Sequence, residues 1–344
     1  MNLNLQTVQL SQEKLHSILD KFKTKKIAVL GDVGIDRYTH GSVERISPEA
    51  PVPIVFVQSE NLKLGLAANV ADNIIALGGR AELTGVVGED KDAKDLISML
   101  RGKRLPTTSL VVDSSRRTIL KERIVAETQQ MLRVDYENTH PLSSSIQKKV
   151  EQNVIQSLKT ADALIIEDYA KGLLSGKMVH SVIEAAKKKK IPVLLDPHVK
   201  SPTGWYLGAT LVKPNKKEAE TLSGMKIVDE ASLIEAGHTI MKKTKSLSLI
   251  ITLGKDGMAI FKTPKGKPVL IPTFSREVYD VSGAGDTVIS VLALALASGA
   301  TLEEAAYISN LAAGVEVSKR GTATVSPDEI IHAFSQDKSQ RARG

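Results

Sequence analysis

Residues 280–287 read Asp-Val-Ser-Gly-Ala-Gly-Asp-Thr and lead directly into an apolar segment, 288–298. We expect that segment to be a helix, whose first N–H groups lack intrahelical acceptors and whose dipole is positive at this end. Gly283 and Gly285 would let the backbone turn tightly and approach a ligand closely. The turn therefore predicts a binding site for an anion such as a phosphoryl group.

Asp286 places a carboxylate at the same turn. A carboxylate beside an anion site is costly unless it has a task, and accepting a proton from a hydroxyl that attacks a phosphate is such a task. The alternative is a simple helix cap, which an isolated Gly-x-Gly-Asp would favour. The rest of the sequence favours the chemical interpretation.

The composition is that of a globular protein, with 344 residues, 42% hydrophobic and 25% charged. This length suits one large α/β domain or two smaller ones. The absence of cysteine excludes disulfides, thiolate metal sites and cysteine nucleophiles. Since the N-terminus lacks a signal-peptide pattern and the longest apolar run, 288–297, is too short for a bilayer, we expect a cytoplasmic protein without membrane association.

The net charge of +7 raises the question of nucleic-acid binding. Six of these seven charges come from two short segments, the four lysines of 187–190 and the tail 337–344 with its net of two. The first is typical of a helix C-terminus and the second of a disordered tail. No aromatic residues interleave with basic ones in either segment, so we expect no nucleic-acid partner.

Short apolar strands alternate with helical patterns along most of the chain. Strands are expected at 27–30, 83–87, 163–166, 193–195, 211–212 and 249–253, and helices at 67–77, 91–101, 144–158, 177–189, 216–223 and 231–243. Such alternation predicts an α/β fold, with a mostly parallel central sheet and helices on both faces.

Four segments, 51–58, 107–112, 118–124 and 132–136, have instead the alternation of half-exposed strands. They predict a small β-sheet lid over an active site, formed from about 36–58 and 107–136. We therefore expect one domain, 26–335, that carries this lid. An N-terminal extension (1–25) would precede it and a disordered basic tail (336–344) would follow.

Four motifs in order carry a family resemblance. They are Leu-Gly-Leu-Ala-Ala-Asn at 64–69, Lys-Pro-Asn-Lys-Lys-Glu at 213–218, Thr-Leu-Gly at 252–254 with Gly257, and Asp-x-x-Gly-Ala-Gly-Asp at 280–286. From about residue 26 to 334 the chain resembles the ribokinase-like (PfkB) sugar kinases. The resemblance implies the ribokinase-like fold and ATP as the phosphoryl donor.

Further segments resemble one branch of that family. They are 31–38, 45–53, 118–123, 129–135 and 168–172. They are similar to the kinases that phosphorylate D-glycero-β-D-manno-heptose 7-phosphate to the 1,7-bisphosphate, on the route to ADP-heptose for the lipopolysaccharide core. Many members of this branch are fused to a nucleotidyltransferase. We expect a stand-alone kinase, because no His-x-Gly-His motif is found here.

The resemblance implies a role for each matching residue. Asp286 would be the catalytic base, while the N–H groups of Gly283, Ala284 and Gly285 would hold the phosphoryl charge. The sugar-binding residues would be Asp36, Gly65 and Asn69. The nucleotide-binding residues would be Asn215, Thr252, Gly254, Gly257 and Asn310.

Two pairs of residues could hold cations. Asn215 and Glu218 lie three apart at a predicted helix start, and their oxygens suit Mg²⁺. The same pattern is that of a helix capping box, and the two interpretations are compatible. Asp280 and Ser282 match positions at which relatives place a monovalent cation, so the resemblance raises K⁺ as a further cofactor.

A phosphorylated sugar also requires cations in its pocket. The candidates are Lys121, Arg123, Arg133 and Lys171, because lysine and arginine are common phosphate ligands. The alternative places these side chains on a solvated face of the lid. An exposed sheet in the lid would favour pairing with a second copy, so we expect a homodimer through the lid.

Two residues depart from the pattern and leave the sugar open. Leu66 stands where the family usually has a second glycine, and His198 where the heptose kinases are expected to have lysine. A kinase for another sugar or sugar phosphate is therefore one alternative. A non-catalytic sugar- or nucleotide-binding regulator is another, and the intact Asp286, Asn215 and Glu218 argue against it.

Overall fold

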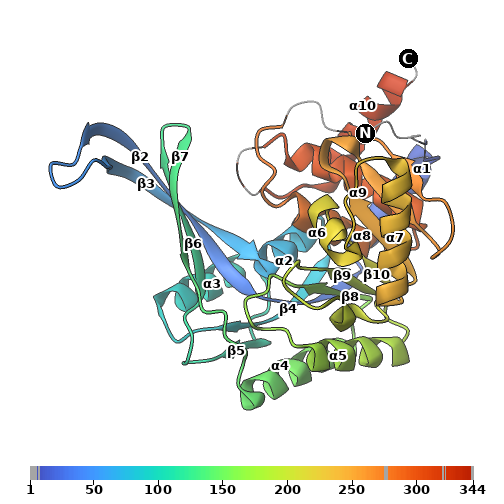
Figure 1. The fold of residues 1–344 in the computed structure, drawn as a ribbon, viewed down its shortest axis with the longest axis horizontal. Coiled ribbons are helices and arrows are strands. Elements are labelled where there is room, and N and C mark those ends of the chain that lie inside the picture. Colours follow the sequence, from blue (N-terminus) through green and yellow to red (C-terminus); the bar gives the residue numbers. More distant parts are fainter. Residues whose placement is uncertain (1–5, 7, 275–277, 320, 322, 342–344) are drawn as a thin grey trace.

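The computed structural model describes Gln6, residues 8–274 and 278–319, Gly321, and residues 323–341. Its strands form two sheets (Figure 1). The larger sheet has nine strands in the order β13-β12-β11-β10-β9-β8-β1-β4-β5. Their bounds are β1 (Lys26–Gly31), β4 (Arg80–Val87), β5 (Leu110–Val112), β8 (Ala163–Glu167), β9 (Val193–Asp196), β10 (Leu211–Val212), β11 (Ser248–Thr252), β12 (Met258–Phe261) and β13 (Val269–Ile271).

The strands from β5 to β11 in this order pair in parallel, and only β12 and β13 are antiparallel to their neighbours. Helices cover both faces. Their bounds are α1 (Gln12–Phe22), α2 (Ala67–Ala76), α3 (Lys91–Gly102), α4 (Ser144–Ser157), α5 (Gly176–Lys188), α6 (Lys216–Ser223), α7 (Glu230–Thr244), α8 (Ala284–Ala297), α9 (Leu302–Glu316) and α10 (Pro327–Arg341). The predicted fold class, a mostly parallel sheet with helices on both faces, is confirmed.

The sheet separates two hydrophobic cores. Because side chains alternate along a strand, Ile27 and Val29 of β1 face one core while Ala28 and Leu30 face the other. The first core lies under α1, α2, α3, α8, α9 and α10, and the second under α4, α5, α6 and α7. Burial on both faces explains why these strands are continuous apolar runs.

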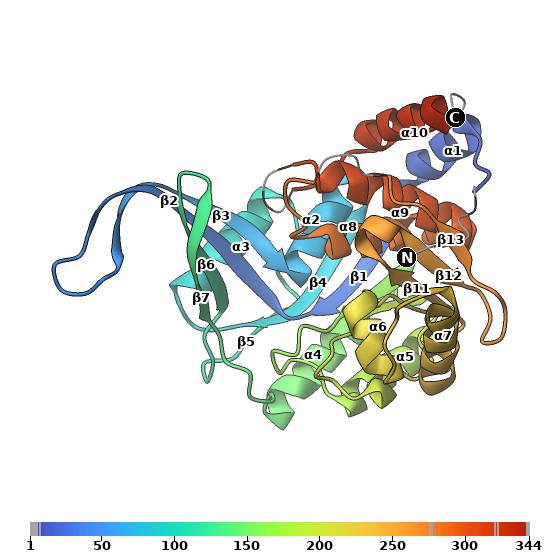
Figure 2. The same ribbon diagram turned by 45° about the horizontal axis from the view of Figure 1, so that its top comes forward.

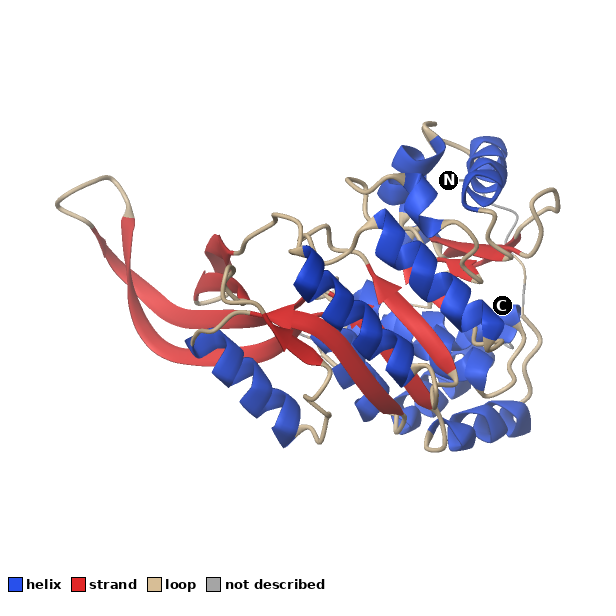
Figure 3. Cartoon of the chain, turned by 90° about the horizontal axis from the view of Figure 1, so that it is seen from below, coloured by secondary structure: helices blue, strands red, loops and turns tan. Residues whose placement is uncertain are grey.

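The smaller sheet is the lid, with strand order β3-β2-β6-β7. It consists of β2 (Val33–Ile46), β3 (Pro53–Leu66), β6 (Ile119–Ala126) and β7 (Gln129–Tyr136). The β2–β3 hairpin is buried where it leaves the main sheet and exposed towards its tip. Figure 3 shows these long strands extending beyond the helices that cover the body. The lid therefore has its root beside the carboxyl end of β1.

One strand expected in the lid belongs elsewhere. Residues 107–112 contribute β5, which pairs in parallel with β4 at the edge of the main sheet. The prediction was wrong because a short edge strand is half-exposed and so has the same alternation as a lid strand. The hairpin is also longer than expected, since β2 begins at Val33 and β3 continues to Leu66.

The first and last helices, α1 and α10, lie side by side. Leu15, Ile18 and Phe22 of α1 enter the first core, and α1 lies beside α10 (Figure 2). Each fully buried side chain of this kind contributes about 1.5–3 kcal/mol. The segment expected to be an N-terminal extension therefore contributes to the core of the body.

The tail was expected to be disordered from residue 336, but α10 continues to Arg341. Its start carries a signal that was missed in the sequence. The Ser326 N–H donates to the Glu329 carboxylate and the Glu329 N–H donates to the Ser326 hydroxyl, on either side of Pro327. Residues 342–344 lie outside the described part of the chain. Within that part, no helix is both long enough and apolar enough to cross a membrane.

Candidate active site

Asp286 lies in the first turn of α8, at the junction between the lid and the carboxyl edge of the main sheet. Its two carboxylate oxygens accept hydrogen bonds from different elements. Asn69 of α2 donates its amide to Oδ2 at 2.7 Å, and Tyr169, just after β8, donates its hydroxyl to Oδ1 at 3.0 Å. Three elements far apart in the sequence therefore hold one carboxylate in a fixed orientation.

Burial raises the pKa of Asp286 to about 6, and the hydrogen bonds from Asn69 and Tyr169 oppose this rise. The nearby Asp196 carboxylate raises the pKa further, whereas the Lys213 ammonium lowers it. A carboxylate with a pKa near 6 is largely ionised at neutral pH and still binds a proton readily. These are the properties of a general base.

A buried charged cluster lies behind Asp286. Lys213 is 3% exposed and pairs with Asp196 at 2.7 Å, and Glu167 ends β8 with 1% exposure. Burial raises the pKa of Glu167 well above its ordinary value, and Asp196 and Asp286 add to the effect. The sequence analysis did not select Glu167 or Asp196. Their signal was their position at the carboxyl ends of parallel strands, where ligands of such sheets bind.

The turn predicted to bind an anion lies at the start of α8, and its limits differ from those expected. The helix begins at Ala284 rather than at 288, and Gly283 is its N-cap with φ of 97°. Ala284, Gly285 and Asp286 therefore form the first turn, and Thr287 makes the first backbone bond back to Gly283 at 2.9 Å. The Ala284 N–H has only a long contact of 3.4 Å to the Val281 carbonyl. The N–H groups in the first turn of a helix lack intrahelical acceptors, so this turn could bind an anion.

A cavity of about 230 Å³ opens beside this turn. It brings together residues predicted to bind the nucleotide with two residues of the anion turn: Thr252, Gly254, Gly257, Asn310, Ala284 and Gly285. Valines at 278, 281, 288 and 317 supply apolar walls. The Asn310 amide is already used structurally, since it donates to the Pro272 carbonyl at 2.7 Å.

Asn215 lies next to this cavity rather than in its lining. It forms an isolated bridge with Thr252 and caps α6, and it exchanges hydrogen bonds with Glu218 in a complete capping box. Burial, with the Asp196 carboxylate nearby, raises the pKa of Glu218 to about 7. Within the described residues, no three His, Asp or Glu side chains form a group that could hold a metal ion.

The lid root holds part of the predicted sugar set. Asp36 pairs with Arg123 at 2.8 Å, and Lys121 lies opposite Asp36 in the adjacent strand. Burial lowers the pKa of Lys121, and the attraction of Asp36 opposes that change. A Cβ on Gly65 would lie 3.2 Å from Asp36 Oδ2, so the glycine allows the close approach of β3 to this carboxylate.

The other two cations predicted to bind phosphate are already paired with carboxylates, close to Lys121 and Arg123. Arg133 is half-exposed and forms two hydrogen bonds with Asp135, at 2.9 and 3.0 Å. Lys171 pairs with Glu137 at 2.5 Å. The structure therefore brings Asp36, Lys121 and Arg123 together, and Arg133 lies opposite Arg123 on the edge strand β7 with its side chain half-exposed.

The predicted monovalent-cation residues lie beside a carboxylate that the sequence analysis missed. Asp280 Oδ1 accepts the Ser282 N–H at 2.9 Å. Glu316, at the end of α9, is 0% exposed, and neither of its oxygens has a well-formed hydrogen bond. Burial raises the pKa of Glu316 to about 8, and Asp280 adds to the rise while the Ala323 N–H opposes it.

The two departures from the family pattern have clear structural consequences. Leu66 has φ of 58° and ψ of −140°, a conformation that L residues rarely adopt, and it immediately precedes α2. Its side chain is buried. His198 lies beyond β9, and burial lowers the pKa of its imidazole. A backbone position that favours glycine is therefore occupied by a leucine close in sequence to Gly65 and Asn69, which are predicted to bind the sugar.

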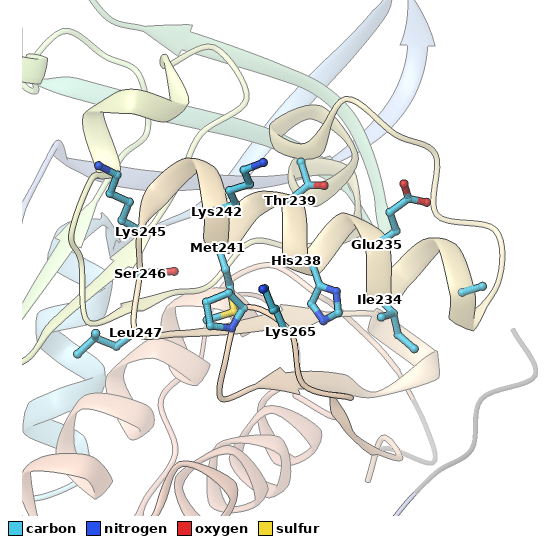
Figure 4. A pocket seen from close by; sticks show the side chains of 12 residues that line it. Ile234, Glu235, His238, Thr239, Met241, Lys242, Lys245, Ser246, Leu247 and Lys265 are labelled. Atoms are coloured by element: carbon cyan, nitrogen blue, oxygen red, sulfur yellow. The ribbon is translucent and has the colours of Figure 1, made fainter.

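A second cavity, of about 900 Å³, lies between α7 and the segment at Pro264 and Lys265 (Figure 4). His238 and Met241 face it together with Lys265, and the His238 ring contacts the Gly266 carbonyl at 2.9 Å. Its lining contains none of the residues predicted to act in the site. The chemistry is therefore assigned to the turn at Asp286 and its surroundings.

Comparison with known proteins agrees with this geometry. The model of the pfkB family carbohydrate kinases matches residues 24–329. This chain belongs to that family. It is therefore a phosphotransferase that uses ATP and a carbohydrate as its substrates.

Curated relatives extend the match. The chain is 42% identical to the bifunctional protein HldE of Trichlorobacter lovleyi, over 95% of this chain and 66% of that protein. It is 45% identical to the bifunctional protein HldE of Helicobacter hepaticus, over 90% of this chain and 64% of that protein. The chain thus spans about two thirds of the length of these relatives.

Solved structures share the fold at low sequence identity. Phosphofructokinase-2 from Escherichia coli in complex with potassium matches with a TM-score of 0.76 and 20% identity, over 91% of this chain and 98% of that one. A putative ribokinase from Agrobacterium tumefaciens matches with a TM-score of 0.73 and 19% identity, over 92% and 99%. The ribokinase-like fold is thereby confirmed.

Proposed function

We propose that this kinase transfers the γ-phosphoryl group of ATP to O1 of D-glycero-β-D-manno-heptose 7-phosphate, which yields the 1,7-bisphosphate used in ADP-heptose synthesis. The observation that carries the chemistry is the Asp286 carboxylate, held by two donors at the anion turn of α8. The choice of sugar is supported by the heptose-kinase motifs and by the similarity to the HldE proteins.

In the proposed reaction, Asp286 accepts the proton of the O1 hydroxyl as that oxygen bonds to the γ-phosphorus. The bond from the γ-phosphorus to the bridging oxygen breaks, and ADP leaves with that oxygen. The N–H groups of the first turn of α8 hold the negative charge that spreads over the transferred group. A pKa near 6 keeps Asp286 deprotonated at neutral pH for this step.

The residues present fit a magnesium ion near Asn215 and Glu218. Three carboxyl groups lie around the single ammonium of Lys213, namely those of Glu167, Asp196 and Glu218. A bound cation would balance the negative charge that Lys213 alone cannot. We propose that Asn215 and Glu218 hold Mg²⁺ together with water and ATP phosphates. The ion, when bound, would neutralise charge on the β- and γ-phosphates.

A potassium ion is proposed beside Asp280 and Ser282. The fit rests on Glu316, a buried carboxyl group beside Asp280 without well-formed hydrogen bonds, which would carry a poorly solvated negative charge once it loses its proton. A monovalent cation at this loop would offset that charge near the anion turn.

For the sugar, we propose that Asp36 and Asn69 contact hydroxyl groups and that Gly65 lets the ring approach β3. Lys121 and Arg123 are proposed to contact the 7-phosphate from the lid root, and Lys171 from the turn after β8. Arg133, which is bound to Asp135 and half-exposed, would reach the phosphate only if it left that partner.

The outer part of the lid supports a homodimer. It exposes large apolar side chains that a second copy could cover, namely Val43, Ile46, Val52, Phe56, Val57 and Leu132. We propose that two chains pair through these lid faces. Light scattering on the wild type and on a Phe56→Glu, Val57→Glu variant would test this, and a monomeric wild type would refute it.

A kinase for another sugar is the second candidate, and Leu66 favours it. Leu66, with φ of 58°, places a side chain near the proposed sugar site at a position where the family usually has glycine. The experiment incubates the protein with ATP, Mg²⁺ and heptose 7-phosphate, fructose 6-phosphate, sedoheptulose 7-phosphate, ribose or fructose, and measures ADP release. Turnover with heptose 7-phosphate alone supports the first candidate, and turnover with another sugar only supports the second.

A further inference from the structure

Tyr169 is the second residue after β8, on a turn whose shape is tightly fixed. Asp168 accepts the Ala170 N–H at 2.8 Å and the Tyr206 hydroxyl at 2.9 Å, and Ala170 has φ of 53°. The Tyr169 ring packs against the first hydrophobic core. The ring therefore cannot swing freely, and its hydroxyl is delivered to a defined point, Oδ1 of Asp286.

We propose that Tyr169 is a positioning residue, which fixes the Asp286 carboxylate for proton abstraction and links it to the lid. The proposal rests on the proposed function, in which Asp286 is the base. Tyr169 itself touches neither the sugar nor the phosphates in this mechanism.

Two hydrogen bonds fix the orientation of the Asp286 carboxylate. Asn69 holds Oδ2 of Asp286 and Tyr169 holds Oδ1, so rotation of the carboxylate would break both bonds. Each oxygen has a second lone pair, so one remains available for the proton of the attacking hydroxyl. Burial raises the pKa of Tyr169, and the Asp286 charge adds to the rise, so the phenol stays neutral and keeps donating.

The ring of Tyr169 contacts the lid. The ammonium of Lys121, on lid strand β6, lies 5.9 Å from the centre of the Tyr169 ring, within the range of a cation–π contact. Lys121 also lies opposite Asp36 in the register of β2 and β6. One tyrosine therefore contacts a lid cation through its face and the base through its hydroxyl.

The test is Tyr169→Phe, which keeps the ring and removes only the hydroxyl. We expect kcat to fall by about a hundredfold, because the carboxylate loses one of its two holding bonds. The KM for the sugar should stay within about twofold, because the phenol makes no contact with the sugar. The acidic limb of the kcat–pH profile should move up by about one pH unit, because the lost bond stabilised the charged form.

A matched control is Tyr206→Phe, which removes a buried phenol hydroxyl that binds the same turn from a distant segment. That hydroxyl binds Asp168 rather than Asp286. We expect this variant to unfold at a lower temperature and to keep the wild-type acidic limb. A purely structural role for Tyr169 would give the same result for both variants, and that outcome would overturn the proposal.

The failure of this proposal can be separated from failure of the proposed function. Carbon-13 NMR of protein labelled at aspartate carboxyl carbons, assigned with Asp286→Asn, follows the titration of Asp286 without any substrate. A higher pKa in Tyr169→Phe supports the positioning role even if no sugar is turned over. An unchanged pKa of Asp286 overturns it even if the wild type is an active heptose kinase.

The link to the lid has its own test. Lys121→Met removes the ammonium and keeps a long side chain, and it is combined with Tyr169→Phe in a double-mutant cycle. If the two residues act as one unit, the loss of kcat in the double variant is smaller than the product of the two single losses. Independent, multiplicative losses would overturn the link between Tyr169 and the lid.

Discussion

Lys213→Met should destabilise the folded protein strongly, because Lys213 is the cation inside a buried group of carboxylates. Its ammonium lies 2.7 Å from Asp196, with the two side chains 3% and 17% exposed. At that separation the attraction is about 6 kcal/mol for an effective dielectric of about 20. Removing one partner leaves Asp196 buried and unpaired, which costs about 3–5 kcal/mol.

The assay is thermal and urea unfolding of the wild type and the variant. With an unfolding entropy of about 0.7 kcal/mol/K for 344 residues, this loss should lower the Tm by about 4–7 °C. Lys217→Met, which removes an exposed lysine from α6 just after Lys213, is the matched control and should change the free energy of unfolding by less than about 0.5 kcal/mol.

The stability lost in Lys213→Met should also depend on pH. Burial already raises the pKa of Asp196 in the folded state, and losing Lys213 would raise it further. A carboxyl with a raised folded pKa favours the folded state at low pH and disfavours it as pH rises from the unfolded pKa to the folded one. The deficit of Lys213→Met should therefore be smaller at about pH 5 than at about pH 8.

The double variant Lys213→Met, Asp196→Leu should recover most of the stability, since no unpaired charge remains. A deficit below about 1 kcal/mol, or one that is the same at both pH values, would refute the reasoning. Either result would mean that water or a rearranged side chain compensates Asp196 when Lys213 is absent.

Three further predictions concern the site. Asp286→Asn should abolish turnover, while sugar binding measured by calorimetry persists. In the wild type, activity should fall as the pH drops through about 6, because the Asp286 base becomes protonated. Asn215→Ala should lower the free energy of unfolding by about 1 kcal/mol through the lost cap and should raise the Mg²⁺ concentration needed for activity. Gly257→Ala should lower the free energy of unfolding in urea by at least about 2 kcal/mol. Residue 257 has φ of 93°, and an added Cβ would lie 1.9 Å from the Ile271 carbonyl oxygen. A variant as stable as the wild type would show that this turn can move.

The parts of the fold that followed from the sequence are those in which local and tertiary preferences agree. The helix expected at 216–223 has those limits, because Asn215 and Glu218 form a capping box and Gly224 ends the helix at φ of 81°. The continuous apolar run of β1 likewise indicates that the strand is buried on both faces. Such segments encode their structure in a few neighbouring residues.

The parts that did not follow depend on contacts between distant segments. The strand at 110–112 has lid-like alternation, and only its pairing with β4 assigns it to the main sheet. The helix at 284–297 starts four residues earlier than its apolar run, because Gly283 at φ of 97° already supplies the turn. Glu167 and Glu316 belong to no motif, and the motif at 168–172 gives Tyr169 no role. Only the folded chain brings these residues to Asp286 and Asp280.

Buried polar groups are nearly always hydrogen-bonded in folded proteins, so exceptions call for a physical reason. Within the described residues, the exceptions include Glu167 Oε1 and both oxygens of Glu316. Both residues are nearly or fully buried, and one lies beside Asp286 while the other lies beside Asp280. Burial raises the pKa of each, so the free protein can retain protons where cations would otherwise bind. The proposed cations should therefore displace protons as they bind, and calorimetry in buffers of different ionisation enthalpy should detect that release. If Mg²⁺ and K⁺ bind with no release near neutral pH, these carboxylates do not belong to the cation sites.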